Sequence, residues 1–379
     1  MKKQFIVDQK ALFALLSSMQ PICSKRTALD ITTSILFHVG QKELVLKSTD
    51  LEISLQSSCS LVKSDFDEPV SFLVSGRRVF EVVKELEGMI TCKLSAHQIS
   101  FQANGVNVSL NIKDAQEFPP FPERIENLLQ LDAPLLHQML DCVGFLIPQN
   151  NANIALNGLF LELSPQELIM TTTDGHCLAQ VKTPRTTFKE SKSWLLPRRA
   201  IFELKKILEV IPDTTLFLGV CGNQLVFSGE LFNFFTRVLA DQFPNYRSIL
   251  NRDSFAPASI ERSSLLKALR RSVCLLSNQF IAARFAFAEK DVHVSLQNKE
   301  VGELDEQVSY NGSHKTHMDI RLYTPYLLNG IQAFQDEDLT FYLKNGTSPV
   351  IFESANDEFS MTYLVMPVSP TAQQREGSA

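Results

Sequence analysis

The chain has 379 residues, of which 44% are hydrophobic and 21% charged, with only 15 glycines and 17 prolines. This balance excludes disordered, collagen-like and low-complexity chains, and the length predicts two or three domains. The formal net charge of −6 gives no overall attraction to nucleic acid or to an anionic membrane. Any contact with DNA therefore requires a local basic face.

The seven cysteines are widely separated and contain no C-x-x-C pair, a pattern typical of reduced thiols in a cytoplasm. Near the start, the apolar run 11–16 follows Asp8, Gln9 and Lys10, which predicts an amphipathic helix and not a signal peptide. No window approaches the roughly 18 apolar residues of a membrane span. We expect a cytoplasmic protein with no membrane partner.

The predicted elements, taken in chain order, repeat three times at a spacing of about 125 residues. Each repeat opens with an acidic residue followed by a helical stripe of apolar residues; the three acidic residues are Asp8, Asp132 and Glu261. A strand then leads into a second helix, and the second helices start near Arg77, Arg198 and Tyr323.

A hairpin ends each repeat. In residues 98–112 apolar and polar residues alternate on both sides of Asn104-Gly105, a strong signal for a tight turn. Similar pairs of strands are expected within 224–240 and 349–366. The three hairpins place these phenylalanines at equivalent positions: Phe101, Phe227 and Phe352.

Proline-rich joints at 118–122 and 243–246 end strand-rich regions, because proline cannot continue a strand ladder. They predict domain boundaries near 125 and 250. The expected domains are 1–125, 126–250 and 251–369, followed by a flexible tail at 370–379. Each domain should carry two helices on mostly antiparallel sheets, so the predicted fold class is α+β.

Common enzyme signatures are absent: the chain has no G-x-G-x-x-G, Walker loop, H-E-x-x-H or G-x-S-x-G. The most catalytic-looking group is Asp174, His176 and Cys177, for which a structural turn is the favoured interpretation and a hydrolase the alternative. His314 and His317 have metal-ligand spacing, but no further ligands complete a site. We expect no enzyme activity, no metal and no cofactor.

Basic residues gather where the helices begin or run. The window 261–271 holds four positive residues and one negative residue in a chain whose total is −6. Such segregation is what a phosphate-facing surface requires, although a solvated helix face would account for any one of these helices. Their recurrence at equivalent repeat positions favours the interpretation that these helices face DNA.

Four motifs occur together in this chain: Thr173-Asp174-Gly175-His176-x-Leu178-Ala179, Phe243-Pro244-x-Tyr246-Arg247, Leu276-Ser277-Asn278 and Tyr363-Leu364-Val365-Met366-Pro367. With them, residues 1–369 resemble the bacterial beta sliding clamps, the processivity subunits of DNA polymerase III. The resemblance implies three similar domains per chain and a head-to-tail homodimer that closes as a ring around duplex DNA, with helices lining the bore. It implies a clamp that holds DNA without reading its sequence and tethers the polymerase; a divergent paralogue with a modulatory role is the alternative.

The resemblance also implies three sets of site residues. The DNA-binding set is Lys25, Arg26, Arg77, Asn150, Arg198, Arg199, Arg270 and Arg271. The groove for partner peptides is Leu156, Thr173, Gly175, His176, Leu178, Pro244, Ile249, Phe280, Tyr326, Val365, Met366 and Pro367. The dimer interface is Val108, Leu110, Leu275 and Leu276. The implied partners are double-stranded DNA, the DNA polymerase III alpha subunit, the clamp loader and other replication and repair proteins that carry a clamp-binding motif.

Four positions depart from the family pattern. Cys177 and Ser248 stand where the family usually has arginines at the groove rim, which predicts a weaker preference for acidic peptide ends. Gln98 and Gly105 stand where basic residues are familiar at the dimer interface. We therefore expect the ring to close mainly through apolar contacts.

Overall fold

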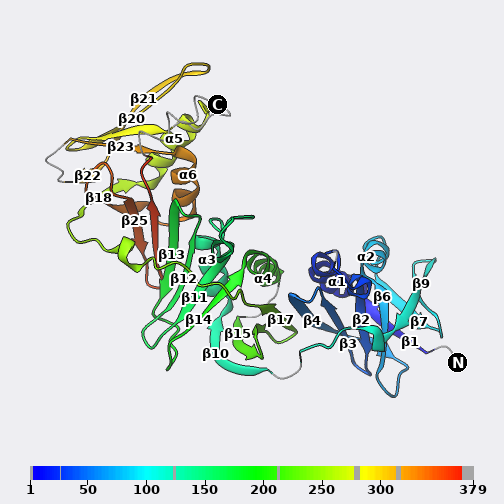
Figure 1. Ribbon diagram of the computed structural model, residues 1–379. Helices are drawn as coiled ribbons and strands as arrows, with labels where there is room; N and C mark the ends of the chain where they lie inside the picture. Colours follow the sequence, from blue (N-terminus) through cyan, green and yellow to red (C-terminus); the bar gives the residue numbers. More distant parts are fainter. Residues whose placement is uncertain are drawn as a thin grey trace. The chain divides into compact units, whose positions relative to one another are not determined.

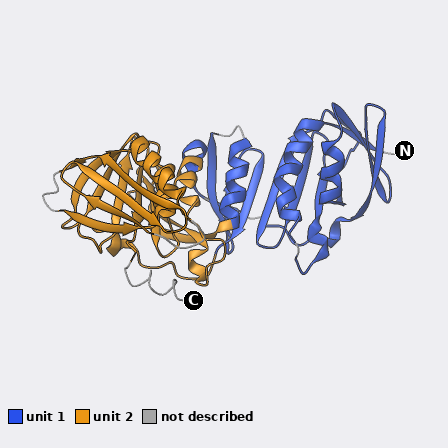
Figure 2. Cartoon of the chain, turned by 90° about the horizontal axis from the view of Figure 1, so that it is seen from above, with its two compact units in different colours: residues 1–136, 199–238 blue, residues 137–198, 239–379 orange. Residues whose placement is uncertain are grey.

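The computed structural model describes residues 3–25, 27–122, 125–210, 214–276, 282–312 and 317–368. It forms two compact units, shown in Figure 2 in blue and orange. Unit 1 comprises residues 1–136 and 199–238, and unit 2 comprises residues 137–198 and 239–379. Among the described residues, no helix is both long and apolar enough to cross a bilayer.

One order of elements, β-α-β-β-β-β-α-β-β-β, runs three times along the described chain, with one short extra strand in the first and third repeats. The first repeat contains β1 Gln4–Asp8, α1 Gln9–Cys23, β2 Ser34–Val39, β3 Glu43–Thr49, β4 Ile53–Ser60, β5 Lys63–Ser64, β6 Val70–Ser75, α2 Gly76–Lys84, β7 Met89–Leu94, β8 Gln98–Ala103 and β9 Val106–Asp114. The second contains β10 Glu126–Asp132, α3 Ala133–Gly144, β11 Gly158–Leu163, β12 Leu168–Thr173, β13 Cys177–Thr183, β14 Lys192–Pro197, α4 Arg198–Val210, β15 Thr215–Cys221, β16 Gln224–Ser228 and β17 Phe232–Arg237. The third contains β18 Ala256–Glu261, α5 Arg262–Val273, β19 Ala283–Phe287, β20 Asp291–Asn298, β21 Gly302–Ser309, β22 Asn311–Gly312, β23 Met318–Leu322, α6 Thr324–Ala333, β24 Asp338–Leu343, β25 Val350–Ala355 and β26 Ser360–Val365. Short 3-10 turns are η1 Asp30–Thr33, η2 Ala115–Glu117, η3 Ile154–Leu156 and η4 Arg247–Leu250.

The predicted α+β class, with two helices per repeat, is confirmed over the described residues. The acidic residues before the first helices have the expected local role in two cases. The Asp8 carboxylate accepts the backbone N–H of Ala11 at 3.1 Å, and the Asp132 carboxylate accepts that of Leu135 at 2.8 Å, so each caps a helix. Glu261 instead accepts the hydroxyls of two serines in the first turn of α5.

The three predicted hairpins are present as β8–β9, β16–β17 and β25–β26. The first turns at Asn104 and Gly105, whose φ angles are 45° and 82°, the left-handed geometry that asparagine and glycine tolerate best. The second hairpin ends at Arg237, earlier than the expected residue 240. The equivalent phenylalanines are all buried in cores, at 0% for Phe101, 2% for Phe227 and 5% for Phe352.

Unit 1 is built on one 13-stranded sheet of described strands, in the order β10-β15-β16-β17-β4-β3-β2-β6-β9-β8-β7-β1-β5. Helix α1 packs on β3 and β4 beside α2 (Figure 1). The first and second repeats are joined by the antiparallel pair β17–β4, in which Phe234 lies opposite Leu55. This pairing explains why half of the second repeat belongs to unit 1.

Unit 2 contains a nine-stranded sheet, in the order β14-β11-β12-β13-β26-β25-β24-β18-β22, and a four-stranded sheet, β21-β20-β19-β23, among its described strands. The second and third repeats are joined by β13–β26, where Ala179 lies opposite Tyr363. Helix α6 approaches β26 so closely that a Cβ atom on Gly330 would lie 1.9 Å from the Tyr363 ring. Glycine is therefore required at this crossing.

Candidate binding sites

The segment between β12 and β13 is a tight structural turn. The Asp174 carboxylate accepts the backbone N–H groups of His176 at 2.8 Å and Cys177 at 2.7 Å, and the Thr173 hydroxyl accepts that of Gly175 at 3.1 Å. Gly175 has a φ of 95°. The first repeat has the same turn, with Asp50 accepting two backbone N–H groups. The favoured interpretation of this motif as a turn is thus confirmed.

The thiol in this turn does not have the environment of a nucleophile. Cys177 is 1% exposed, and burial, as the largest effect, raises its pKa to about 12. The thiol is therefore protonated at neutral pH, whereas a catalytic cysteine needs a thiolate. Among the described residues, no three His, Cys, Asp or Glu side chains are grouped as metal ligands; His314 lies outside those residues.

The predicted peptide groove is split between a buried floor and an exposed rim. Four of its described members are buried: Leu156, Thr173, Leu178 and Val365. The exposed ring of His176 stacks on Tyr326 with centroids 5.8 Å apart. The backbone carbonyl of His176 accepts the backbone N–H of Met366 at 3.0 Å, which ties the end of β26 to the turn. Gly175 and Pro244 are exposed and Pro367 is half-buried, while Phe280 lies outside the described residues.

Two large apolar side chains of the predicted groove, Ile249 and Met366, are exposed, at 43% and 39%. Both line one pocket of about 380 Å³. The pocket is completed by residues that the sequence analysis missed, chiefly Phe255, Lys344 and Pro349. No recognised motif contains these three, and the only sequence signal among them is that Pro349 begins the third expected hairpin. Pairs of exposed apolar side chains facing one cavity are typical of a binding surface.

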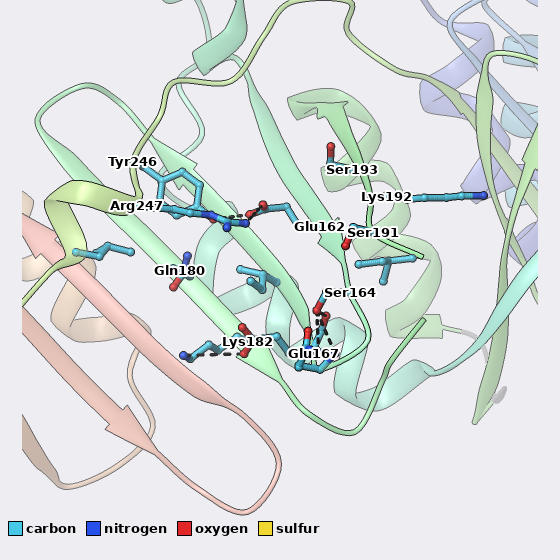
Figure 3. Close-up of a pocket in the computed structure, with 14 residues that line it drawn as sticks. Glu162, Ser164, Glu167, Gln180, Lys182, Ser191, Lys192, Ser193, Tyr246 and Arg247 are labelled. Atoms are coloured by element: carbon cyan, nitrogen blue, oxygen red, sulfur yellow. Dashed lines mark hydrogen bonds and ion pairs between the residues drawn. The ribbon is translucent and has the colours of Figure 1, made fainter. Parts of the chain in front are cut away.

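A second pocket, of about 520 Å³, lies on the sheet face of β11–β13 (Figure 3). Its lining mixes polar and apolar residues and holds charges of both signs, including Glu162, Glu167, Lys182 and Arg247. Lys182 pairs with Glu167 at 3.9 Å, and Arg247 pairs with Glu162 at 2.8 Å. The sequence analysis did not anticipate this pocket.

The basic residues predicted to face DNA are mostly engaged within the chain. In unit 1, Lys25 and Arg199 converge on the fully buried carboxylate of Asp50, and Arg199 also donates to the carbonyl of Pro21 at 3.1 Å. Arg77 is exposed and pairs with Glu81 at 2.9 Å. These contacts neutralise part of the positive charge that was expected to face DNA. The basic helices are also not at equivalent repeat positions, contrary to the expectation from the sequence: Arg77 and Arg199 lie in α2 and α4, the second helices of their repeats, whereas 262–271 lies in α5, the first helix of its repeat.

In unit 2, Arg198 donates to the carbonyl of Ile147, and burial lowers the pKa of its guanidinium. Arg271 pairs with Glu306, with Nε donating at 2.8 Å. Arg270 and Asn150 are exposed, and no ion pair joins Arg270 to another described residue. Arg26 lies outside the described residues.

The predicted dimer-interface residues lie beside two strand edges. Val108 and Leu110 are half-buried on β9, whose residues 106–111 pair with β8 alone among the described strands. Leu275 and Leu276 are half-buried just after α5. The carbonyl of Leu275 accepts a hydrogen bond from Asn298 at 2.7 Å, beside the start of β21, which pairs with β20 alone among the described strands.

Sequence profiles of one family match the chain in three consecutive parts. They describe the N-terminal, central and C-terminal domains of the DNA polymerase III beta subunit and match residues 3–122, 130–245 and 247–369. The chain belongs to the DNA polymerase III beta subunit family. This family membership and the repeated fold together confirm the resemblance that the motifs carried.

Individual beta subunits are similar over almost the whole chain. The beta sliding clamp of Escherichia coli K12 is 26% identical over 370 residues, covering 96% of this chain and 99% of the relative; that of Pseudomonas putida is 24% identical with the same coverage. The solved sliding clamp of Bacillus subtilis superposes with a TM-score of 0.89 at 21% identity, covering 97% and 100% of the two chains. A Pseudomonas aeruginosa clamp bound to griselimycin has a TM-score of 0.89 at 23% identity, with the same coverage. This chain thus shares its three-domain clamp fold with the two solved clamps.

Proposed function

We propose that this protein is a sliding clamp: two copies close head to tail into a ring around duplex DNA and tether the replicative polymerase. Family membership supports this function, and one observation from the fold carries the ring. Each joint between consecutive repeats is an antiparallel pair. It joins the last strand of one repeat to the third strand between the two helices of the repeat before it. The pairs are β17–β4 and β26–β13.

The same rule leaves one strand unused at each end of the chain. The last strand of the first repeat is β9, and the third strand between the two helices of the third repeat is β21. Both have an unpaired edge among the described strands. An exposed strand edge is a template for another chain. Pairing β9 of one copy with β21 of the other would satisfy both edges and close a ring of two chains.

The repeat also gives a register for this joint. Val108 lies opposite Phe101 in its hairpin, as Phe234 and Tyr363 lie opposite the equivalent phenylalanines. Phe234 and Tyr363 each pair with the third residue of β4 or β13. The third residue of β21 is Leu304, so Val108 of one copy should face Leu304 of the other. Leu110 would then face Gly302, beside Leu275, which makes the contact apolar.

The contacts with DNA in this proposal are weak and independent of sequence. Exposed cations such as Arg270 would touch phosphates, while Lys25 and Arg199 are already paired with Asp50. With few phosphate contacts, electrostatic attraction contributes little to the affinity for DNA. Retention on DNA would then come from the closed ring, and the duplex would remain free to slide.

The exposed pair Ile249 and Met366 supports a groove for partner peptides on the second and third repeats, which we assign to domains near 126–250 and 251–369. The proposed partners are the DNA polymerase III alpha subunit, the clamp loader and other proteins with a clamp-binding motif. Peptide binding at about micromolar strength, roughly −8 kcal/mol, would allow partners to exchange. We propose that the clamp itself catalyses no reaction. We also propose that it is located in the cytoplasm, together with the DNA.

The test is whether retention on DNA depends on DNA topology. The clamp is loaded with its clamp loader and ATP onto a nicked circular plasmid, which is then separated from free protein in about 0.5 M NaCl, where electrostatic contacts are largely screened. A ring stays on the circle and leaves once a restriction enzyme linearises it. Equal retention on circular and linear DNA, or loss from both at this salt, would contradict the proposal.

A further inference from the structure

The part of the groove rim that carries Ile249 is a bridging segment, residues 246–252, between the second and third repeats. Its backbone is held by few hydrogen bonds of its own: the N–H of Ile249 donates to the carbonyl of Tyr246 at 3.1 Å, and the N–H of Asn251 donates to that of Ser248 at 3.3 Å. A single 3-10 turn of this kind is weak in isolation. Other contacts must fix the segment on the sheet.

The first anchor lies at the start of the bridging segment. Tyr246 donates its hydroxyl to Glu162 on β11, and Arg247 donates to the other oxygen of the same carboxylate at 2.8 Å; Figure 3 shows both side chains turned towards Glu162. The Glu162 side chain is only 13% exposed. Burial and the bond to Glu162 raise the pKa of Tyr246 to about 12, so the hydroxyl remains a donor at neutral pH.

The second anchor lies at the end of the segment. Arg252 donates through both terminal nitrogens to Glu353 on β25, one of them at 2.6 Å. Tyr342 donates to the same carboxylate at 3.0 Å, and its ring lies 4.8 Å from the Arg252 guanidinium carbon. The Glu353 side chain is 19% exposed. Two-pronged arginine–carboxylate pairs fix geometry better than single contacts do.

Between these anchors Leu250 packs on the core, while Ile249 is left exposed towards the pocket that it shares with Met366. We infer that Glu162 and Glu353 are positioning residues of the peptide groove, which hold the bridging segment so that Ile249 faces Met366. This inference rests on the proposed function, because it assigns the groove to peptides. A rim fixed in advance avoids the entropy of ordering it on binding.

The variants Glu162→Gln and Glu353→Gln keep side-chain shape but remove the charge that holds the arginines. The chain offers a matched control. Arg185 pairs with Glu358 at 2.8 Å and joins the same two repeats without touching the bridging segment. Glu358→Gln therefore reports any general loosening between the repeats.

The experiment measures fluorescence anisotropy of a labelled synthetic peptide that copies the clamp-binding motif of a DNA polymerase III alpha subunit. We expect binding roughly fivefold to tenfold weaker for Glu353→Gln, with a similar loss for Glu162→Gln and none for Glu358→Gln. In an Ile249→Ala background the same two substitutions should cause no further loss, because the anchors act through Ile249. The dimer mass and the melting temperature should stay near wild type.

Each other outcome has a distinct meaning. If wild type binds the peptide and Ile249→Ala weakens it, but the two anchor variants bind normally, the positioning role is wrong and the groove stands. An equal loss in both backgrounds, or in Glu358→Gln, would also overturn the positioning role. If wild type does not bind the peptide at all, the groove itself is wrong and the anchors have no groove to position.

Discussion

Single residues decide the role of each motif in this chain. The group Asp174, His176 and Cys177 has the composition of a catalytic site, yet the Asp174 carboxylate accepts local backbone N–H groups and the Cys177 thiol is buried. Asp50 makes the same turn in the first repeat, but its carboxylate also forms ion pairs with Lys25 and Arg199. A fully buried carboxylate requires such partners. Arg199 therefore fixes the joint between two repeats, a role that a count of helix charges does not reveal.

The buried Cys177 thiol predicts a loss of stability at alkaline pH. Its pKa is about 12 in the folded protein against an ordinary 9.0, so the unfolded chain releases the proton first as pH rises. The contribution of the thiol to stability is complete below about pH 9 and is lost between about pH 9 and 12, at about 1.4 kcal/mol per pH unit. Other buried thiols, such as Cys142 with a pKa of about 12, add to the slope.

Urea unfolding followed by circular dichroism between about pH 8 and 10.5 measures this slope. Cys177→Ala should reduce the slope of unfolding free energy against pH by the contribution of one thiol, whatever the substitution does to stability at pH 8. Cys274→Ala, at an exposed position, should leave the slope unchanged. An unchanged slope in Cys177→Ala would mean that burial does not keep this thiol protonated in the folded state.

At the scale of elements, the joints follow from strand edges. The pairs β17–β4 and β26–β13 extend sheets from one repeat into the next, and the exposed edges of β9 and β21 repeat that geometry at the two ends. The outward positions of β9 are uncharged over residues 106–111, whereas β21 carries Glu303, Asp305 and Glu306. Ion pairs across this joint are therefore few, and apolar contact at Val108 and Leu110 must carry it.

The register of the joint can be tested by cross-linking. In a chain with Cys274→Ser, the combined substitutions Val108→Cys and Leu304→Cys should give a disulfide-linked dimer under mild oxidation, because directly opposite residues on neighbouring strands lie within bonding reach. Gel electrophoresis without reductant measures the dimer. A matched pair one position out of register, Val108→Cys with Asp305→Cys, should link poorly. Equal linking of both pairs would show that β9 and β21 do not meet in this register.

The sequence was sufficient for the repeat because hairpins and helix stripes are local signals. Asn104-Gly105 requires a left-handed turn, and Asp8 and Asp132 cap helices within three residues of themselves. The anchors of the bridging segment could not be predicted in this way. Glu162 and Arg247 are 85 residues apart, and Arg252 and Glu353 are 101 apart. Such pairs depend on which strands become neighbours, which a single sequence does not encode in any local pattern.

At the scale of the whole molecule, ring closure explains how a negatively charged protein can stay on DNA. The net charge of −6 and the internally paired basic residues leave a weak attraction to phosphates, which would make a poor open-sided DNA-binding protein. In a closed ring the same weakness becomes an advantage, because it leaves the duplex free to move. The account therefore depends on two copies of this chain forming a ring.

The most direct test of this claim is the mass in solution, measured by light scattering at moderate salt over a wide range of protein concentration. We expect a species of twice the 42.6 kDa of one chain, persisting on dilution, and its conversion to a monomer by Leu110→Asp, which places a charge in the apolar joint. A wild-type chain that remains a monomer at every concentration would contradict a ring that closes through β9 and β21.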